Sequence, residues 1–144
     1  MNWDLRLAMA AMMALTLPSN AWALNTAAPL LCSVSVAHQC DAGVPCSQVT
    51  PEVLNLPDFL VIDHQAKQVR MLGSSAADRI TAIKHSEIVR GNLILQGAES
   101  SEESDREAVG WTVAIDDESG QMVATATDGG SAIVAFGKCI ERAK

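Results

Sequence analysis

The alternation of large apolar residues with small or polar ones predicts β-strands along most of the chain. It is clearest between residues 108 and 116, where every second side chain is large and apolar. This two-residue period is typical of a strand with one buried face. The large residues are Val109, Trp111, Val113 and Ile115. We therefore expect a strand here with these side chains in the core.

Two short polar segments divide the last part of the chain into three strands. Asp116–Gly120 and Asp128–Gly130 each begin with an aspartate, whose side chain can accept hydrogen bonds from nearby backbone N–H groups. Both segments contain glycine, which tolerates a positive φ. Residues 132–136, after the second turn, are apolar at every position. We expect residues 110–139 to form three antiparallel strands, the last in a part of the sheet covered on both faces.

The same pattern predicts further strands earlier in the chain. An apolar residue or cysteine recurs at every second position from Leu30 to Val36. Residues 59–63 and 68–72 are typical of a hairpin around a four-residue turn, with Val69 and Met71 pointing inward. The other expected elements are a short edge strand between Ser47 and Pro57, a polar loop at 73–78, and strands at 79–84 and 92–97. No helical pattern of useful length follows Ala23.

Short strands joined by polar turns indicate an all-β fold. The expected arrangement is a single antiparallel meander of about eight strands, rolled into a small up-and-down barrel. A β-sandwich is the alternative. The barrel is favoured because closure removes exposed strand edges, which otherwise promote aggregation.

The N-terminus has the features of a signal peptide, with a signal helix in residues 1–23. A short polar region precedes an apolar run at 7–17, and Ala21-Trp22-Ala23 offers a small-x-small cleavage site. The run is far shorter than the ~20 apolar residues of a membrane-spanning helix. We therefore predict cleavage after Ala23, which leaves a soluble domain, 24–144, exported to the periplasm or the extracellular medium.

The acidic composition narrows the range of partners. The formal net charge of −7 argues against nucleic acid or an anionic membrane, because both are polyanions. A basic protein or a small apolar ligand remains compatible with this charge. Between residues 99 and 107 the chain is acidic and polar with no large apolar side chain, so we expect a flexible acidic loop there.

Four cysteines, Cys32, Cys40, Cys46 and Cys139, follow the signal peptide, so two disulfides are expected in an oxidising compartment. Cys32 and Cys40 lie on or next to one extended strand, where ~3.3 Å per residue would separate their Cα atoms by roughly 26 Å, beyond the ~7 Å limit of a disulfide. The turn-like segment 41–45 would fold Cys46 back towards Cys40. This favours Cys40–Cys46, and it leaves Cys32–Cys139 to join the first and last strands.

Residues that could carry chemistry do not form a recognisable site. His38, His64 and His85 lack the i, i+2 or i, i+4 spacing that supports a metal site, although His64 and His85 each lie near a carboxylate. No Gly-x-Ser-x-Gly or Ser-x-x-Lys motif marks a nucleophile. Carboxylates are so frequent that Asp63, Asp116 and Glu99 cannot be singled out as an acid–base pair. We therefore assign no catalytic, metal or cofactor residue and expect no cofactor.

Several segments of the second half resemble a family of small exported proteobacterial proteins of unknown function. The members share an early cysteine cluster, a β-meander and a closing Phe-Gly-x-Cys, here Phe136 to Cys139. The similar segments are residues 93–99, 110–116, 119–122 and 134–139. The acidic stretch 100–106 departs from the family as an insertion. The family has no known activity, so the resemblance implies no catalytic residue.

Periplasmic lysozyme inhibitors are a second comparison, because they too are small β-barrels tied by disulfides. An acidic surface would suit a cationic lysozyme. Their inhibitory loop, however, carries a Ser-Gly-x-x-Tyr type motif, whereas this chain has no tyrosine. Residues 73–76 match that loop only in being small and polar.

The sequence favours a non-enzymatic envelope protein that binds a small ligand or a protein partner. A periplasmic inhibitor of a cationic hydrolase is one alternative. A metal-dependent hydrolase that uses His64, His85 and nearby carboxylates is another.

Overall fold

The computed structural model describes residues 23–25, 27–73, 79–100 and 108–142. These residues contain nine β-strands and no helix. The strands are β1 (Leu30–Asp41), β2 (Ser47–Val49), β3 (Phe59–Asp63), β4 (Gln68–Leu72), β5 (Ile80–Val89), β6 (Asn92–Ser100), β7 (Ala108–Asp116), β8 (Gln121–Thr127) and β9 (Ser131–Glu141). The predicted all-β fold is confirmed.

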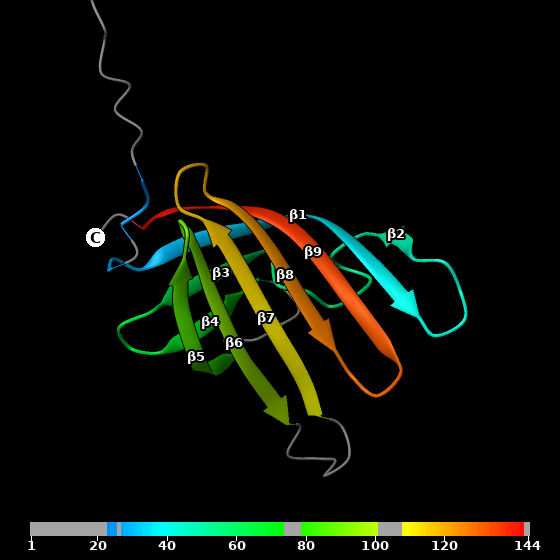
Figure 1. Ribbon diagram of the computed structural model, residues 1–144. Helices are drawn as coiled ribbons and strands as arrows, with labels where there is room; N and C mark the ends of the chain where they lie inside the picture. Colours follow the sequence, from blue (N-terminus) through cyan, green and yellow to red (C-terminus); the bar gives the residue numbers. More distant parts are fainter. Residues whose placement is uncertain (1–22, 26, 74–78, 101–107, 143–144) are drawn as a thin grey trace, which may run out of the picture.

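Eight of the strands close into an antiparallel barrel (Figure 1). The sheet order is β1-β3-β4-β5-β6-β7-β8-β9, and β9 pairs again with β1 along most of its length. The short β2 is an extra strand, which pairs with residues 37–39 of β1. The up-and-down barrel expected from the sequence is therefore the observed architecture, and the sandwich alternative is not.

Two disulfides fix the barrel seam and its outer extension. Cys32 and Cys139 are direct cross-strand partners on β1 and β9, with exposed fractions of 0% and 1%. Cys40 and Cys46 join the end of β1 to the segment just before β2. Both pairs are those that the cysteine spacing favoured. The first one links two residues that are 107 positions apart in sequence.

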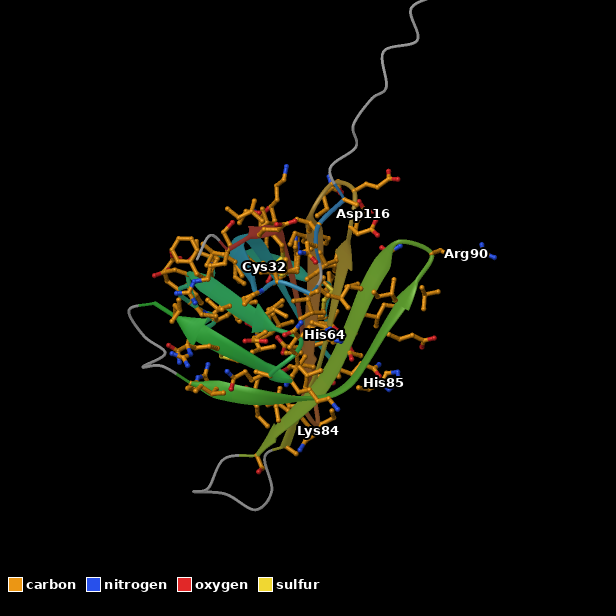
Figure 2. All side chains as sticks on the ribbon, turned by 90° about the vertical axis from the view of Figure 1, so that its left-hand side faces the viewer. Cys32, His64, Lys84, His85, Arg90 and Asp116 are labelled. Carbon is orange, nitrogen blue, oxygen red and sulfur yellow. A yellow bond between two sulfur atoms is a disulfide. The ribbon has the colours of Figure 1, made fainter. Side chains whose placement is uncertain are left out.

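One end of the barrel, here called the closed end, carries the β5–β6 and β7–β8 turns. Figure 2 shows Arg90 and Asp116 of these turns at the same end, far from Lys84. The Asp117 N–H donates to the Gly91 carbonyl across the two turns, at 2.8 Å. Leu24 packs against the core here, and its N–H donates to the Asp117 carbonyl. The opposite end, with the β8–β9 turn and the end of β1, is the open end.

Large side chains fill the barrel towards the closed end. The fully buried ones are Leu30, Ile62, Leu93, Leu95, Ile115 and Met122, together with the Cys32–Cys139 disulfide. They come from β1, β3, β6, β7, β8 and β9, and the buried Val69 of β4 and Ile83 of β5 belong to the same cluster, so every strand of the barrel contributes to one core. Val113 and Ile115 are buried as the alternating pattern predicted, with exposed fractions of 5% and 1%.

A β-bulge in β1 corrects the predicted alternation of that strand. The register with β9 shifts between Val34 and Val36, so the residues after the shift change faces. Ala37 is fully buried, whereas Val36 pairs with the partly exposed Phe136 on the outside. β1 pairs with β3 only at 30–33 and meets β2 from Ala37 onward. The strand therefore leaves β3 at the bulge, which opens the barrel at that end.

Three other sequence-based expectations need adjustment. Phe136 is 42% exposed, so residues 132–136 are not covered on both faces. β5 continues to Val89, five residues past the expected end at Lys84, because it pairs with β6 up to a two-residue turn at Arg90 and Gly91. β6 extends through Ser100, two residues into the expected acidic loop.

Some predictions lie outside the described residues. These are the signal helix as far as residue 22, most of the polar loop at 74–78, and residues 101–107 of the acidic loop. Within the described part, no helix is long and apolar enough to cross a membrane.

Candidate functional site

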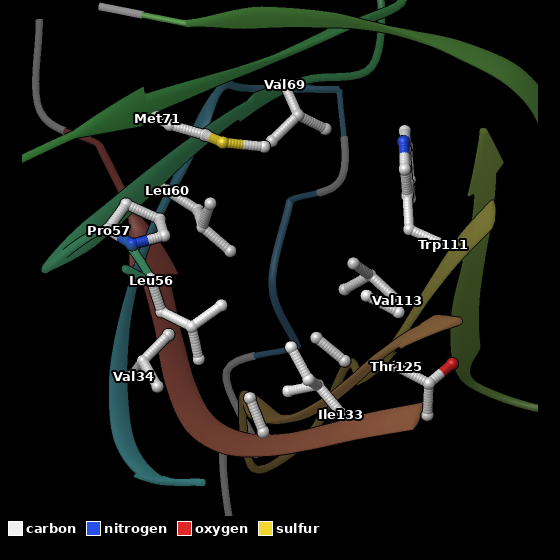
Figure 3. A pocket seen from close by; sticks show the side chains of 13 residues that line it. Val34, Leu56, Pro57, Leu60, Val69, Met71, Trp111, Val113, Thr125 and Ile133 are labelled. Atoms are coloured by element: carbon white, nitrogen blue, oxygen red, sulfur yellow. The ribbon is translucent and has the colours of Figure 1, made fainter. Parts of the chain in front are cut away.

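The interior of the barrel towards its open end contains a cavity of about 100 Å³ (Figure 3). Leu60 of β3 and Met71 of β4 form one wall, and Trp111 and Val113 of β7 face them. β8 and β9 complete the wall with alanines and Ile133. Every atom exposed inside is apolar. The cavity therefore suits a hydrocarbon surface and offers nothing to an ion or a sugar.

Small side chains explain why this half of the barrel is hollow. The inward positions of β8 and β9 here are Ala124, Ala126, Ile133 and Ala135, three of which are alanines. In the closed half, by contrast, the inward residue of β8 is Met122 and that of β7 is Ile115. A methyl group fills much less of the interior than either side chain, so space remains between the alanines and Trp111.

Trp111 is held in place by its neighbours on β5 and β6. Gly97 is its direct partner on β6, and a Cβ atom at residue 97 would collide with the indole ring. The ring therefore lies directly over Gly97, in space that only glycine leaves free. The indole Nε1–H donates to the hydroxyl of the buried Thr81, at 3.2 Å. Because this polar group is already bonded, the ring presents only carbon to the cavity.

The segment between β2 and β3 lies at the mouth of the cavity. Its Leu56 and Pro57 side chains complete the lining opposite Trp111 (Figure 3). The backbone bonds of this segment are local: the Leu56 N–H donates to the Pro51 carbonyl at 2.9 Å, and the Val53 N–H donates to the Thr50 carbonyl at 3.1 Å. Side-chain packing therefore contributes most of its contact with the barrel.

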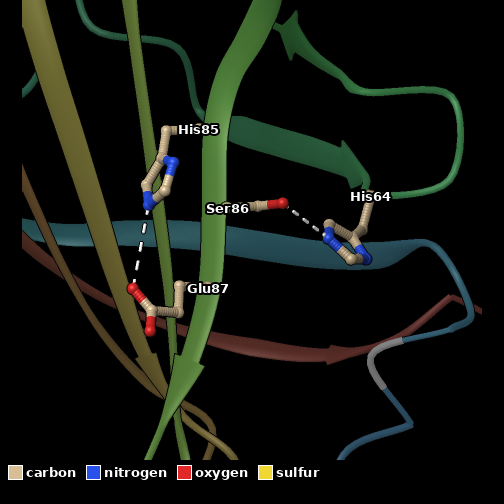
Figure 4. Close-up of polar contacts among 4 residues, drawn as sticks. All are labelled: His64, His85, Ser86 and Glu87. Atoms are coloured by element: carbon tan, nitrogen blue, oxygen red, sulfur yellow. Dashed lines mark hydrogen bonds and ion pairs between the residues drawn. The ribbon is translucent and has the colours of Figure 1, made fainter.

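The three histidines that the sequence singled out do not converge. His64 Nε2 shares a hydrogen bond of 2.9 Å with the Ser86 hydroxyl. His85 lies on the opposite side of β5, 3.8 Å from Glu87 (Figure 4). His38 is on the outer face of β1, where its ring packs edge-on against Phe136. The described residues contain no group of three or more metal-ligating side chains.

The carboxylates considered in the sequence analysis, Asp63, Asp116 and Glu99, do not lie together in one site. Asp63 and Asp116 form turns, in which Asp63 accepts from the Ala66 N–H and Asp116 from the hydroxyl and N–H of Ser119. These bonds from Ser119 lower the pKa of Asp116. The pKa of Asp128 is also lowered by hydrogen bonds, of which the one from the Gly130 N–H has the largest effect and those from Ser131 follow. Glu99 is on β6, on the face that looks into the barrel.

The residues that shape the cavity were missed by sequence reasoning. Ala124, Ala126 and Ala135 are ordinary strand residues, and their size becomes informative only when the opposite wall is known. The Gly97–Trp111 pair could have been noticed as a glycine inside a strand, which often marks a close approach. Only the strand register, however, shows that Trp111 is the residue that faces Gly97.

Comparisons with known proteins give no relative. No family model, no curated protein and no solved structure matches the chain.

Proposed function

We propose that this is an exported, non-enzymatic protein that binds a small apolar ligand inside the open half of its barrel. The observation that carries the proposal is the apolar cavity between Trp111 and the alanines of β8 and β9. Concave apolar sites at the mouths of β-barrels are common ligand sites. The two disulfides are consistent with an oxidising, exported location.

The size of the cavity limits the ligand. A dry cavity of about 150 Å³ is enough to hold benzene. The cavity of about 100 Å³ seen here is smaller, but it is open at its mouth, so a small ring or the end of a short chain would enter it with its outer part extending through the mouth. Burying roughly six carbons at about 0.8 kcal/mol each gives about 5 kcal/mol, which corresponds to a Kd on the order of 0.2 mM.

Toluene is a suitable probe, because it is apolar and has the size of one ring. We expect toluene to shift the amide and methyl NMR signals of residues around Trp111 and Met71, with saturation in the sub-millimolar to millimolar range. Signals of the closed half, such as those of Leu93 and Leu95, should shift less. Unchanged spectra up to the solubility limit of toluene would disprove the proposal.

The substitution Ala124→Leu tests the cavity directly. The larger side chain points inward and occupies the space that the ligand needs. We expect toluene affinity to fall at least tenfold, while stability changes by no more than about 1.5 kcal/mol, because leucine also removes empty volume. Affinity is measured by NMR titration and stability by urea unfolding.

Ala98→Leu is the matched control. Ala98 is exposed and lies on β6, where the alternation directs it away from the interior. Its substitution should leave toluene binding unchanged. If Ala124→Leu binds toluene as well as the unsubstituted protein, the ligand site lies elsewhere.

A further inference from the structure

Glu99 has a carboxylate oxygen that is buried and unbonded. Among the buried side-chain oxygens and nitrogens of the described residues, Oε1 of Glu99 alone has no hydrogen-bond partner. A buried polar atom without a partner is costly, and the cost is larger for a charged group. Such a group in a protein with a ligand cavity points to a contact that the ligand itself supplies.

Glu99 does not line the cavity itself, but the strand register places it next to Trp111, which does. Leu95, Gly97 and Glu99 lie on the same face of β6, and Leu95 is fully buried inside the barrel. Gly97 pairs with Trp111, and Glu99 is the next inward residue towards the open end. The indole of Trp111 therefore lines the cavity and also covers the strand that carries Glu99.

Two exposed carboxylates lie at the open end of the barrel. Asp41 ends β1 and Asp128 begins the β8–β9 turn, and both are exposed at this end of the barrel. The whole chain carries a formal net charge of −7. Carboxylates near the mouth and a negative whole-chain charge favour the approach of cations over that of carboxylates and phosphates.

We propose that the ligand is a small amphiphilic amine, whose hydrocarbon body fills the cavity and whose ammonium group binds Glu99. This inference rests on the proposed function and names its ligand class. An ionised carboxylate only accepts hydrogen bonds, and an ammonium group supplies both donors and the opposite charge. The face of Trp111 adds an attraction for a cation close to the ring.

Four probes with the same ring separate the two parts of the site. Toluene tests the cavity alone, and benzylamine, benzyl alcohol and benzoate add a cationic, a neutral and an anionic head group. At neutral pH we expect benzylamine to bind roughly tenfold or more tightly than benzyl alcohol, as a charged hydrogen bond would give. Benzoate should bind more weakly than toluene. NMR titrations give all four affinities on one protein.

Glu99→Gln removes the charge and keeps the shape of the side chain. We expect it to weaken benzylamine binding roughly tenfold and to leave toluene binding within about twofold. Glu87→Gln is the matched control, because Glu87 is an exposed carboxylate on the outside of β5, with 64% of its side chain accessible. The control should bind all four probes like the unsubstituted protein.

The outcomes distinguish this inference from the proposed function. If toluene binds but benzylamine shows no advantage, or Glu99→Gln does not weaken benzylamine, the amine ligand is wrong and the apolar site stands. If Glu99→Gln weakens toluene equally, Glu99 supports the fold and the amine ligand is again wrong. If no probe binds, both proposals are wrong.

Discussion

Gly97 determines where the Trp111 ring lies. The ring occupies the space that a side chain on residue 97 would need, and in that position its Nε1–H donates to the Thr81 hydroxyl. A methyl group there pushes the indole into the cavity. This single glycine therefore controls both the packing of the barrel wall and the volume left for a ligand.

Gly97→Ala should lower the free energy of unfolding by about 1–3 kcal/mol, because the added methyl overpacks the wall. It should also weaken toluene binding, because the displaced ring reduces the cavity. Urea unfolding and NMR titration measure the two effects. Gly110→Ala is the control: its Cβ would meet only the Thr127 hydroxyl, at 3.7 Å, so stability should be unchanged or up to about 1 kcal/mol higher. Equal losses for both variants would contradict the assigned role of Gly97.

The turn residues Asp116 and Asp128 make the stability of the fold depend on pH in the acidic range. Hydrogen bonds from Ser119 lower the pKa of Asp116, and those from Gly130 and Ser131 lower the pKa of Asp128. A carboxylate whose pKa is lower in the folded state stabilises the fold above its ordinary pKa of 3.8. That contribution is lost as the pH falls through the folded-state pKa values.

The double variant Asp116→Asn, Asp128→Asn should therefore lose less stability than the unsubstituted protein between pH 5 and pH 2, although it is slightly less stable at pH 7. Thermal unfolding across this range gives the slopes. Glu118→Gln, in the first of the two turns, serves as the control and should keep the original slope. An unchanged slope in the double variant would show that other carboxylates dominate acid unfolding.

At the scale of the elements, most strands could be predicted because one face of each is buried. The hairpin of β3 and β4 and the three strands β7 to β9 appear where they were expected, the last three marked by aspartate–glycine turns. The bulge in β1 could not be predicted, because the residue types around Val34 and Val36 are ordinary for a strand and do not mark where the register shifts. The second half of β5 was missed because its residues are mostly polar and exposed, and its pairing with β6 holds it in the sheet.

The two disulfides should contribute unequally to stability. Cys32–Cys139 spans 107 residues and Cys40–Cys46 spans 6. In the chain-entropy model, loops of these lengths correspond to about 5 and about 2 kcal/mol. Replacing Cys32 and Cys139 by alanine should therefore reduce the unfolding free energy by about 3 kcal/mol more than replacing Cys40 and Cys46. Urea unfolding of both double variants tests this order, and the reverse order would contradict it.

At the scale of the whole molecule, the barrel has a filled half and a hollow half. The filled half could be predicted in part, because its large residues alternate along the strands. The hollow half could not, because Ala124, Ala126 and Ala135 form a cavity only where closure of the barrel places them opposite Trp111. Glu99 could not be selected either, since one carboxylate among 17 acidic residues has no special pattern.

This division predicts uneven protection against hydrogen exchange. Amides of Leu93, Leu95 and Ile115 lie in the packed half and should exchange only when the whole domain unfolds. The Leu56 amide, whose bond to Pro51 stays within the connecting segment, should exchange through local opening and much faster. Exchange measured by NMR in D₂O checks this. Equal protection of all four amides would mean that the segment at the mouth does not open independently.

The seam disulfide also changes what a protease can do to this molecule. Because Cys32 and Cys139 are covalently joined, the polypeptide between them is a closed ring. A single cut anywhere in that ring leaves both fragments tethered, so a nicked protein would migrate as one species until a reducing agent is added. A protein built this way can survive a first cleavage with its two pieces still held side by side.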